Sequence, residues 1–582
     1  MTTEAPSRRR LLARAARWGG GLALAPAAAP LHAQPAYELR HERISPLRAE
    51  RGMVASAHAL ATAAGVEVLR DGGNAVDAAV AVGFTLAVVL PFAGNLGGGG
   101  FMLVHAGHSG RVHAFDFRET APAAATRDMF VDARRDVIRG RSLHSHLAVG
   151  VPGTVAGFAQ VHQRFGRLPF ARLLEPAIRH AREGFVVGPT LAMLLAADAE
   201  RLRRWPATRE IFLPRGTPPV VGERLLQADL ADSLQRIARD GPRAFYEGDL
   251  AGRIAEEMAR HQGLITRDDL RRYRALEREP VAGGYRGHRV VSMPPPSSGG
   301  VHLIQMLGLL EAWPLASHGH NSAQTIHLLA EVMKRAYADR AEHLGDPDFI
   351  RVPVRGLLSP RYLRTLAAGI DPLRATPADT IRPGRPQDHE SDQTTHYSVA
   401  DRDGNLVSTT YTLNLSFGSG IVAAGTGILL NNEMDDFAIK AGVPNAFGLT
   451  GGDANAVGPM KRPLSSMTPT IVLKDGRPWL ATGSPGGSRI ITTVLQTIVN
   501  MIDFGMNAAE AGVAARVHHQ WQPDELRVER GISVDTLALL RARGHSISER
   551  PAMGSTQTIV VDEKGFAGWS DSRSPEGAAA GF

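Results

Sequence analysis

The 582-residue chain contains no cysteine. This absence excludes a thiol nucleophile, a disulfide bond and a thiolate metal site, and it leaves the cellular compartment open on redox grounds. No stretch reaches the roughly 18 uninterrupted apolar residues that a membrane-spanning helix requires, so we expect a soluble mature protein. The net charge is +7, yet no basic block alternates with aromatic residues, which argues against a nucleic-acid partner.

Apolar side chains and turn-forming residues are both abundant. Apolar residues make up 43% of the chain, which also contains 62 glycines and 37 prolines. This apolar content can build a large core, and the glycine and proline content indicates many turns instead of long coiled helices. The length alone suggests about three or four domains.

The N-terminus has the three-part layout of a secretory leader. Residues 7–12 are rich in arginine, residues 19–29 form a short run of Gly, Ala, Leu and Pro, and Leu31-His32-Ala33 fits a cleavage site. We therefore expect residues 1–33 to be a signal peptide and the mature protein to be periplasmic or secreted. Paired arginines before leucines resemble a twin-arginine signal, so both the Sec and the Tat export routes stay open. The alternative is a disordered tail rich in alanine and arginine.

Hydrophobic periodicity predicts helices early in the chain and more strands later. Residues 51–70 and 74–89 have helical spacing, with Asn74 as the N-cap of the second segment, and most of residues 147–285 follow the same period. Strand patterns occur at residues 101–104 and 112–117 and become frequent after residue 394. This order predicts an α+β fold with two sheets stacked between helical layers.

A glycine tract, Gly97-Gly98-Gly99-Gly100, precedes the first of these strands. It lacks the residue order of a phosphate-binding loop and leads into a strand instead of a helix. We therefore predict close packing of backbone against backbone at this tract.

The segment Asp392-Gln393-Thr394-Thr395-His396-Tyr397-Ser398-Val399 joins a polar loop to a predicted strand. Cleavage of the Gln393–Thr394 bond would give Thr394 a free α-amine, whose pKa of about 7.7–8.0 lets it act as a base near neutral pH. The threonine hydroxyl would then have a proton acceptor in its own residue and could act as a nucleophile. The alternative is a β-branched residue that merely opens a strand.

Several later segments carry polar groups that have ordinary structural explanations when each is taken alone. Thr412 and Asn414 lie on or just past the partner strand of the predicted hairpin, where they could sit beside the first strand or simply cover the sheet. Residues 431–437 cluster carboxylates, including Glu433 and Asp436, which could bind an ammonium group or form a solvated turn.

Two further loops offer hydroxyls and glycines. Ser465 and Ser466 lie in a proline-bounded loop, and Gly486 and Gly487 come just before a predicted helix. Backbone N–H groups at such a position could face a developing oxyanion, because glycine permits close approach and the helix start favours negative charge. The alternative is an ordinary connection from a strand to a helix.

Taken together, these segments resemble the γ-glutamyltranspeptidases, a family of self-cleaving N-terminal-nucleophile hydrolases. The resemblance spans roughly residues 44–582. The matching segments are Gly94-Asn95-Leu96-Gly97-Gly98-Gly99-Gly100, Asp116-Phe117-Arg118-Glu119, the Pro-Pro-Pro-Ser-Ser-Gly-Gly run, Thr394-Thr395-His396-Tyr397-Ser398-Val399, Tyr411-Thr412-Leu413-Asn414, Asn431-Asn432-Glu433-Met434-Asp435-Asp436-Phe437, Arg462-Pro463-Leu464-Ser465-Ser466-Met467 and Gly483-Ser484-Pro485-Gly486-Gly487-Ser488.

The resemblance implies a four-layer αββα fold and a precursor that cuts itself between Gln393 and Thr394. It implies a large subunit of residues 34–393 and a small catalytic subunit of residues 394–582, which stay together as a heterodimer without metal or cofactor. The implied roles are Thr394 as nucleophile, Thr412 as its hydrogen-bond partner, Gly486 and Gly487 as the oxyanion hole, Arg118, Ser465 and Ser466 on the substrate α-carboxylate, and Asn414, Glu433 and Asp436 on its α-amine.

One position departs from the pattern of the family. Residues 440–458 resemble the lid loop of many bacterial members, but Phe447 stands where some of them carry a tyrosine. Phenylalanine can cover a pocket but cannot make the tyrosine hydrogen bond, which leaves lid closure and the balance of hydrolysis and transfer open. The alternative is a mobile surface loop.

The resemblance thus implies a γ-glutamyl hydrolase and transpeptidase that acts on glutathione and related compounds and passes the γ-glutamyl group to water, amino acids or dipeptides. One alternative is a cephalosporin (glutaryl) acylase of the same fold. Its substrates can lack the α-amine, so the presence of Asn414, Glu433 and Asp436 favours a γ-glutamyl head. The other alternative is a non-catalytic periplasmic protein that binds γ-glutamyl peptides on an uncleaved chain.

Overall fold

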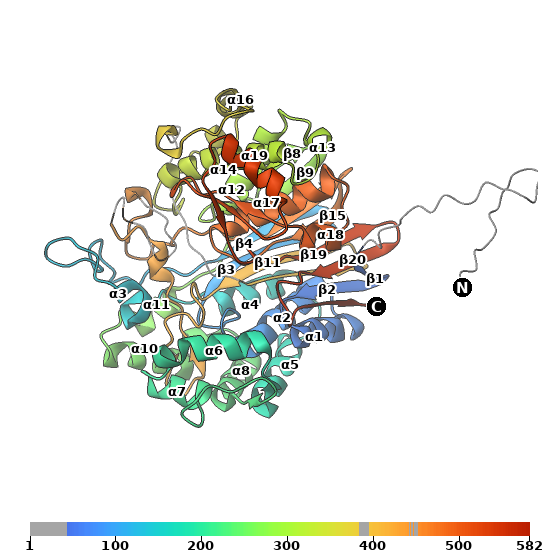
Figure 1. Ribbon diagram of the computed structural model, residues 1–582. Helices are drawn as coiled ribbons and strands as arrows, with labels where there is room; N and C mark the ends of the chain where they lie inside the picture. The colour runs from blue at the N-terminus through green and yellow to red at the C-terminus, as the bar shows by residue number, and fades with distance from the viewer. Residues whose placement is uncertain (1–43, 383–394, 441–442, 444–445, 447–451) are drawn as a thin grey trace, which may run out of the picture. The chain divides into compact units, whose positions relative to one another are not determined.

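Two antiparallel sheets lie face to face at the centre of the fold, with helices on both outer sides (Figure 1). The computed structural model describes residues 44–382, 395–440, 443, 446 and 452–582. One seven-stranded sheet has the order β1 (Leu47–Ala49), β20 (Gly565–Ser570), β19 (Gln557–Asp562), β15 (Arg477–Thr482), β14 (Thr470–Lys474), β9 (His288–Ser292) and β8 (Val281–Tyr285). The other has the order β21 (Ala578–Gly581), β2 (Gly52–Ser56), β10 (Thr395–Asp401), β11 (Leu406–Thr412), β3 (Gly99–Ala106), β4 (Arg111–Phe117) and β7 (Leu276–Arg278).

Helices and a few short strands make up the rest of the described structure. The α-helices are α1 (Ala59–Arg70), α2 (Ala75–Val89), α3 (Arg141–His144), α4 (Thr154–Phe165), α5 (Phe170–Glu183), α6 (Pro189–Leu202), α7 (Pro206–Phe212), α8 (Ala228–Asp240), α9 (Arg243–Tyr246), α10 (Asp249–Arg260), α11 (Arg267–Arg272), α12 (Gly299–Leu310), α13 (Leu315–His318), α14 (Ala323–His343), α15 (Val354–Leu357), α16 (Pro360–Ala368), α17 (Arg489–Ile502), α18 (Ala508–Val513) and α19 (Val534–Ala542). The short 3-10 helices are η1 (His146–Ala148), η2 (Ala378–Thr380), η3 (Glu433–Asp436) and η4 (Asp453–Asn455), and the short strands are β5 (Phe185–Val186), β6 (Arg224–Leu225), β12 (Val422–Ala423), β13 (Ile428–Leu429), β16 (Val517–His518), β17 (Leu526–Val528) and β18 (Ile547–Glu549).

Three buried apolar clusters define the four layers. One cluster joins α1, α2, α4, α5 and α8 to the outer face of the sheet that contains β10, and a second joins α12, α14 and α17 to the outer face of the other sheet. The third cluster lies between the sheets and includes Phe101, Leu103, Ile471 and Ile559. The predicted αββα arrangement is therefore confirmed. Residues 44–582 form one compact unit, so the three or four domains suggested by length were wrong.

Strand β10 shows how the sequence assigns its side chains to these layers. Side chains alternate between the two faces of a strand, and Tyr397 and Val399 belong to the cluster on the helix side. Ala400 belongs to the cluster between the sheets, and the Ser398 hydroxyl donates to the Gln557 carbonyl of β19 at 2.9 Å. The strand is buried on both faces, which fits its run of threonine, tyrosine and valine.

Most predicted elements agree with the structure, and one does not. Asn74 caps α2 through a capping box with Asp77, and the hairpin of β10 and β11 forms as predicted. The helix predicted over residues 51–70 was wrong in its first part, because Gly52–Ser56 is strand β2. The alanine-rich pattern favours a helix locally, but β2 pairs with β10 and β21, and these non-local ladders decide the outcome.

The glycine tract packs backbone against backbone, which confirms the prediction made for it. A Cβ atom on Gly98 would lie 2.0 Å from the carbonyl oxygen of Thr412, and one on Gly97 would lie 2.1 Å from the carbonyl oxygen of Leu429. The Asn95 amide also donates to the Thr412 carbonyl at 2.8 Å and accepts from the Gly98 N–H at 3.0 Å. The tract thus holds the end of β11 in place.

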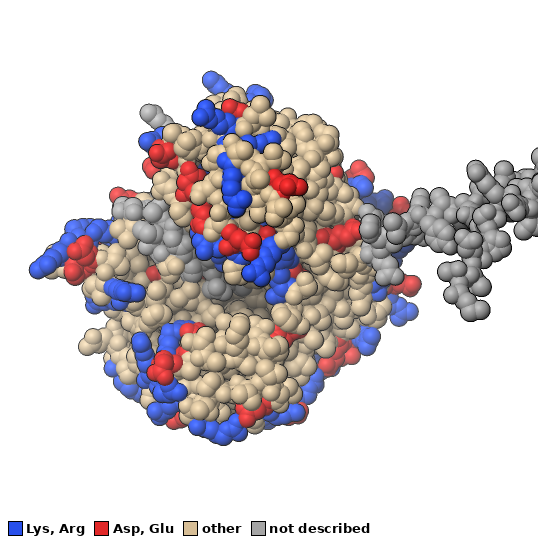
Figure 2. Space-filling view, viewed as in Figure 1, with Lys and Arg blue, Asp and Glu red and all other residues tan. Residues whose placement is uncertain are grey.

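Charged side chains of both signs are mixed over the face shown in Figure 2, which is also hollowed between its upper and lower parts. Nucleic-acid binding requires a surface dominated by positive charge, and neither sign of charge dominates the face shown. Among the described residues, no helix combines the length and the apolar character needed to cross a membrane.

We expect Gly98→Ala to lower the stability of the protein by about 1–3 kcal/mol, because the new methyl group must displace backbone and not a flexible side chain. Gly284→Ala is the matched control, since a Cβ on Gly284 meets nothing within 4 Å. The measurement is the thermal melting temperature of each purified variant. Equal melting temperatures for the two variants would contradict the packing described for the glycine tract.

Candidate active site

The ends of β10 and β11 bring two of the predicted site residues together. Thr412 ends β11, and its hydroxyl oxygen accepts from the Asn414 N–H at 2.8 Å. Asn414 has a left-handed backbone with φ of 76°, and its side-chain amide donates to the Asn432 carbonyl at 2.9 Å. Thr395 begins β10 and pairs with Tyr411. Gln393 and Thr394, the predicted cleavage site and nucleophile, lie outside the described residues, as does Phe447.

A buried arginine lies between two of the predicted carboxylates. Arg118 follows β4, and its two terminal nitrogens donate to Glu433 and Asp436 at either end of η3. Its Nε donates to the Pro463 carbonyl at 3.2 Å, and a terminal nitrogen also donates to the Leu464 carbonyl at 3.0 Å. The guanidinium and the carboxylates, which were predicted to hold opposite ends of a substrate, thus bind each other directly.

A third carboxylate, which was not predicted as a site residue, belongs to this cluster. Glu119 is fully buried, and its Oε2 lies 3.6 Å from the Arg118 guanidinium. Both Glu119 oxygens, one Glu433 oxygen and one Asp436 oxygen are reached by no N–H or hydroxyl donor of the described residues. Three carboxyl groups therefore surround one guanidinium, and free acceptor oxygens remain.

Burial and mutual repulsion shift the pKa values of these groups. Burial raises the pKa of Glu119 to about 7 and that of Glu433 to about 8, despite the opposing attraction of Arg118. Burial also raises the pKa of Asp436 well above its usual value. Burial alone would lower the pKa of Arg118, but the neighbouring carboxylates outweigh it and raise that pKa. A cluster with excess acidic groups of this kind favours a ligand that brings a positive charge.

Two asparagines hold η3 in place, and neither was predicted as a site residue. The Asn431 side-chain oxygen accepts from the N–H groups of Glu433 at 3.0 Å and Gly150 at 2.9 Å. Its amide donates to the carbonyls of Gly97 and Gly150, each at 2.8 Å. Asn455 donates to the Asp436 carbonyl at 2.6 Å. Asn431 stood in a matched segment, and Glu119 stood next to Arg118, but nothing in the sequence marked their partners.

The predicted serine loop lies against residues 294–300, the Pro-Pro-Pro-Ser-Ser-Gly-Gly run. The Ser465 carbonyl accepts from the Ser298 N–H at 2.7 Å, and the Ser465 N–H donates to the Pro296 carbonyl at 2.9 Å. The Ser466 hydroxyl accepts from Arg340 of α14 at 3.3 Å. Because Leu464 also accepts from Arg118, this loop carries both serines next to the carboxylate cluster.

The predicted glycine pair lies in the loop from β15 to α17. Gly486 and Gly487 have φ of 128° and 56°, a backbone region that favours glycine. Neither N–H donates to an acceptor in the part of the chain that the structure describes. The same loop packs on β10, since a Cβ on Gly483 would lie 2.4 Å from Nδ1 of His396. Burial lowers the pKa of His396 to about 3, so this imidazole is neutral.

Helix α14 connects the serine loop and the glycine loop. Tyr337 donates to the Ser488 carbonyl, and Arg340, one turn further along the helix, donates to Ser466 and Ser298. Hydrogen bonds of Asn432 to Leu413 and Asn414 connect the carboxylate cluster to the end of β11. The described residues predicted for the site therefore lie on segments that hydrogen bonds of α14 and Asn432 connect to one another.

Comparisons with known proteins show which family the chain resembles over almost its whole length. The family model described as Gamma-glutamyltranspeptidase matches residues 61–581. The chain is 54% identical to a glutathione hydrolase proenzyme of Escherichia coli (strain K12) over 97% of each chain, and 45% identical to one of Pseudomonas sp. (strain A14) over 92% of this chain and 95% of the relative. Among solved structures, a cephalosporin acylase from Bacillus halodurans is similar with a TM-score of 0.84 and 31% identity, covering 94% of this chain and 99% of that chain.

The raised pKa of Glu119 leads to a prediction about stability and pH. Its folded-state pKa of about 7 exceeds the ordinary value of 4.5, so the folded state binds the proton more tightly than the unfolded chain does. Its contribution to stability therefore falls as the pH rises from about 4.5 to about 7 and then stays low. We expect Glu119→Gln, which is neutral at every pH, to gain stability relative to the wild type across this window.

The measurement is the difference in melting temperature between Glu119→Gln and the wild type at pH 5 and at pH 8. The exposed Glu563→Gln serves as the control and should show the same small difference at both pH values. A Glu119→Gln difference that does not change with pH would contradict the assignment of the raised pKa to Glu119.

Proposed function

Since the chain belongs to the γ-glutamyltranspeptidase family, we propose that it cuts itself and then cleaves the γ-glutamyl amide of glutathione and related compounds. The γ-glutamyl group passes to water or to the amine of an amino acid or dipeptide. The observation that carries this proposal is the buried cluster of Arg118, Glu433 and Asp436 beside the ends of β10 and β11. Such a cluster has both charges that a zwitterionic amino-acid head requires.

The cluster can bind each end of that head. The substrate α-carboxylate would take the guanidinium of Arg118, whose planar fork suits a carboxylate, together with the hydroxyls of Ser465 and Ser466. The α-amine would donate to Glu433, Asp436 and the side chain of Asn414, where carboxylate oxygens without donors are available. The zwitterion adds one positive and one negative charge, so it leaves the net charge of the cluster unchanged. Its carboxylate would replace a protein carboxylate as the partner of Arg118, and its amine would replace Arg118 as the partner of Glu433 and Asp436.

Thr394 would supply the chemistry. In maturation its hydroxyl attacks the carbonyl carbon of Gln393, and the bond from that carbon to the Thr394 nitrogen breaks, which frees the α-amine and leaves an ester. Water then hydrolyses the ester, which restores the Thr394 hydroxyl and leaves Gln393 with a free carboxylate. In turnover the α-amine takes the hydroxyl proton while the oxygen attacks the γ-carbonyl, and the leaving amine departs with a proton. Water or an acceptor amine then breaks the acyl-enzyme ester and restores the hydroxyl.

Two other groups would assist this chemistry. The N–H groups of Gly486 and Gly487 are proposed to bind the oxyanion of each tetrahedral intermediate. Thr412 is proposed to hydrogen-bond to the nucleophilic hydroxyl, since its own hydroxyl lies at the end of the strand that pairs with β10.

The proposed subunits, residues 34–393 and 394–582, share both sheets. Strand β10 pairs with β2, β11 pairs with β3, and β14 pairs with β9, so each sheet contains hydrogen-bonded ladders between strands of the two subunits. Cutting one peptide bond removes none of these ladders, which supports a heterodimer that stays associated after cleavage. Export to the periplasm or the medium through residues 1–33 completes the proposal.

We expect the wild-type protein to mature into two fragments that begin at Gln34 and Thr394, and Thr394→Ala to remain one chain without activity. The alanine variant lacks the only hydroxyl proposed to attack Gln393. Thr395→Ala is the matched control, because the Thr395 hydroxyl has no partner among the described residues and should be dispensable for cleavage. Intact mass spectrometry reads out each variant. Cleavage of Thr394→Ala at the same bond would remove Thr394 as the nucleophile.

Glutaryl acylases share this fold, so the donor must be tested directly. We expect γ-glutamyl anilide to be cleaved with a kcat/KM roughly 10–100 times that of glutaryl anilide, because each hydrogen bond to a charged group contributes about 1.5–3 kcal/mol. Asp436→Asn should reduce this preference. Faster cleavage of the glutaryl substrate would identify an acylase, whereas an uncut chain that turns over neither anilide would identify a binding protein.

A further inference from the structure

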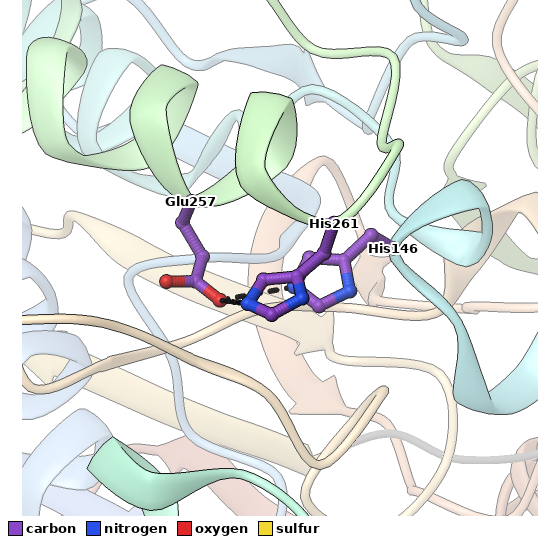
Figure 3. A group of neighbouring side chains, drawn as sticks. All are labelled: His146, Glu257 and His261. Carbon is purple, nitrogen blue, oxygen red and sulfur yellow. Dashed lines mark hydrogen bonds and ion pairs between the residues drawn. The ribbon is translucent and has the colours of Figure 1, made fainter.

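Two histidines and a glutamate converge at a place that the proposed reaction does not use. Nε2 of His146, on η1, lies 3.0 Å from Oε1 of Glu257, and Nε2 of His261 lies 3.4 Å from the same oxygen. Figure 3 shows both imidazoles facing this carboxylate from one side. His146 and Glu257 are buried, whereas the side chain of His261 is 35% exposed.

We propose that His146, Glu257 and His261 bind a Zn²⁺ ion. Two imidazole nitrogens and one carboxylate oxygen are a donor set that zinc accepts, with the fourth position left for water. Zinc–ligand bonds of about 2.0–2.2 Å in a tetrahedron separate the donor atoms by roughly 3.3–3.5 Å. The separations of 3.0 and 3.4 Å are close to this requirement, and the three donor atoms lie within 4.8 Å of one another.

The surroundings of the cluster hold the ring of His146 in place and leave the ring of His261 more room to move. The rings of His146 and His261 stack at 4.6 Å, and Trp205 packs edge-on against both. The lone pairs of stacked imidazoles lie in nearly parallel ring planes, so one ring must tilt before both lone pairs can point at one ion. His261 follows the last residue of α10 and its side chain is 35% exposed, so its ring can tilt with less loss of packing than the buried ring of His146. Arg260 lies 3.4 Å from the other Glu257 oxygen but is mostly exposed and can move away.

A second group of similar composition shows what an unsuitable cluster looks like. Glu331, near His327 and His545, already accepts from Lys334 and Arg335. His327 uses Nε2 on the Asp371 carbonyl and Nδ1 on His545, each at 2.8 Å. The Glu331 carboxylate is thus already paired with two buried cations, which a metal ion would have to displace. In the Glu257 cluster, by contrast, both histidines direct Nε2 at the shared carboxylate.

The ion would also stabilise a segment that borders the candidate active site. On the same segment as His146, the Ser142 hydroxyl donates to Asp435 at 2.6 Å, and the Leu143 carbonyl accepts from Asn432 at 3.0 Å. Binding to the folded state alone raises its stability by mass action. Zinc should therefore raise the melting temperature as well as bind.

The test is calorimetric titration of the chelator-treated full-length protein with zinc chloride, with melting temperatures measured alongside. We expect one zinc ion per chain, and an affinity lowered at least about tenfold in His261→Ala and in Glu257→Gln. His108→Ala, which removes an exposed histidine elsewhere, should bind zinc like the wild type. The exposed position of His261 keeps its variant informative even if Glu257→Gln fails to fold. The absence of zinc binding by the wild type, or unchanged binding in His261→Ala, would overturn the proposal.

Discussion

The buried guanidinium of Arg118 is the interaction on which the site depends. A charge removed from water costs several kcal/mol unless partners replace the lost hydration. Arg118 has such partners in Glu433, Asp436 and the carbonyls of residues 463 and 464. They come from two segments distant in sequence, so the ion pair fixes η3 and the serine loop relative to β4. Removing the guanidinium would leave the carboxylates around it as uncompensated buried charges.

Asp116 and two further arginines surround Arg118 and its partners. Asp116 of β4 accepts from the Arg118 N–H at 3.0 Å and binds Arg278 at 2.6 Å and Arg462 at 3.1 Å. Arg462 is adjacent to Pro463, whose carbonyl accepts from Arg118. One carboxylate thus sets the backbone on both sides of the guanidinium. This explains how a short polar loop without regular secondary structure can hold Ser465 and Ser466 in fixed positions.

The sequence predicted which residues lie on neighbouring segments of the candidate site better than it predicted the contacts between them. Local patterns were sufficient for the capping box at Asn74 and the hairpin of β10 and β11, because each depends on neighbours in the chain. The glycine composition alone predicted close packing at residues 97–100, but not that the tract would pack on the distant Thr412 and Leu429. The pairing of Arg118 with Glu433 spans 315 residues, and no local pattern encodes such a contact. The strand β2 was missed for the same reason.

Residues that only position others were also hard to predict. Glu119 and Asn431 stood inside segments that matched the family, yet their residue types are equally common in loops and helix ends. Glu119 matters because it is buried and no donor of the described residues reaches its oxygens, and Asn431 because it bonds to backbone groups distant in the chain. Both are properties of the folded molecule alone. The order of the motifs along the chain could suggest the chemistry. The raised pKa values of Glu119 and Glu433 could not be predicted in this way, because they result from burial in the folded molecule.

The arrangement also bears on the order of folding and maturation. Arg118 lies on the N-terminal side of the proposed cleavage site, and Glu433, Asp436 and the glycine pair lie on its C-terminal side. These groups meet only after β10 and β11 have inserted between β2 and β3. A self-cleavage that uses the oxyanion-binding loop therefore requires the whole chain to fold first. The proposed cleavage would then expose the new α-amine inside a site that is already assembled, and the ladders between the proposed subunits would keep it assembled afterwards.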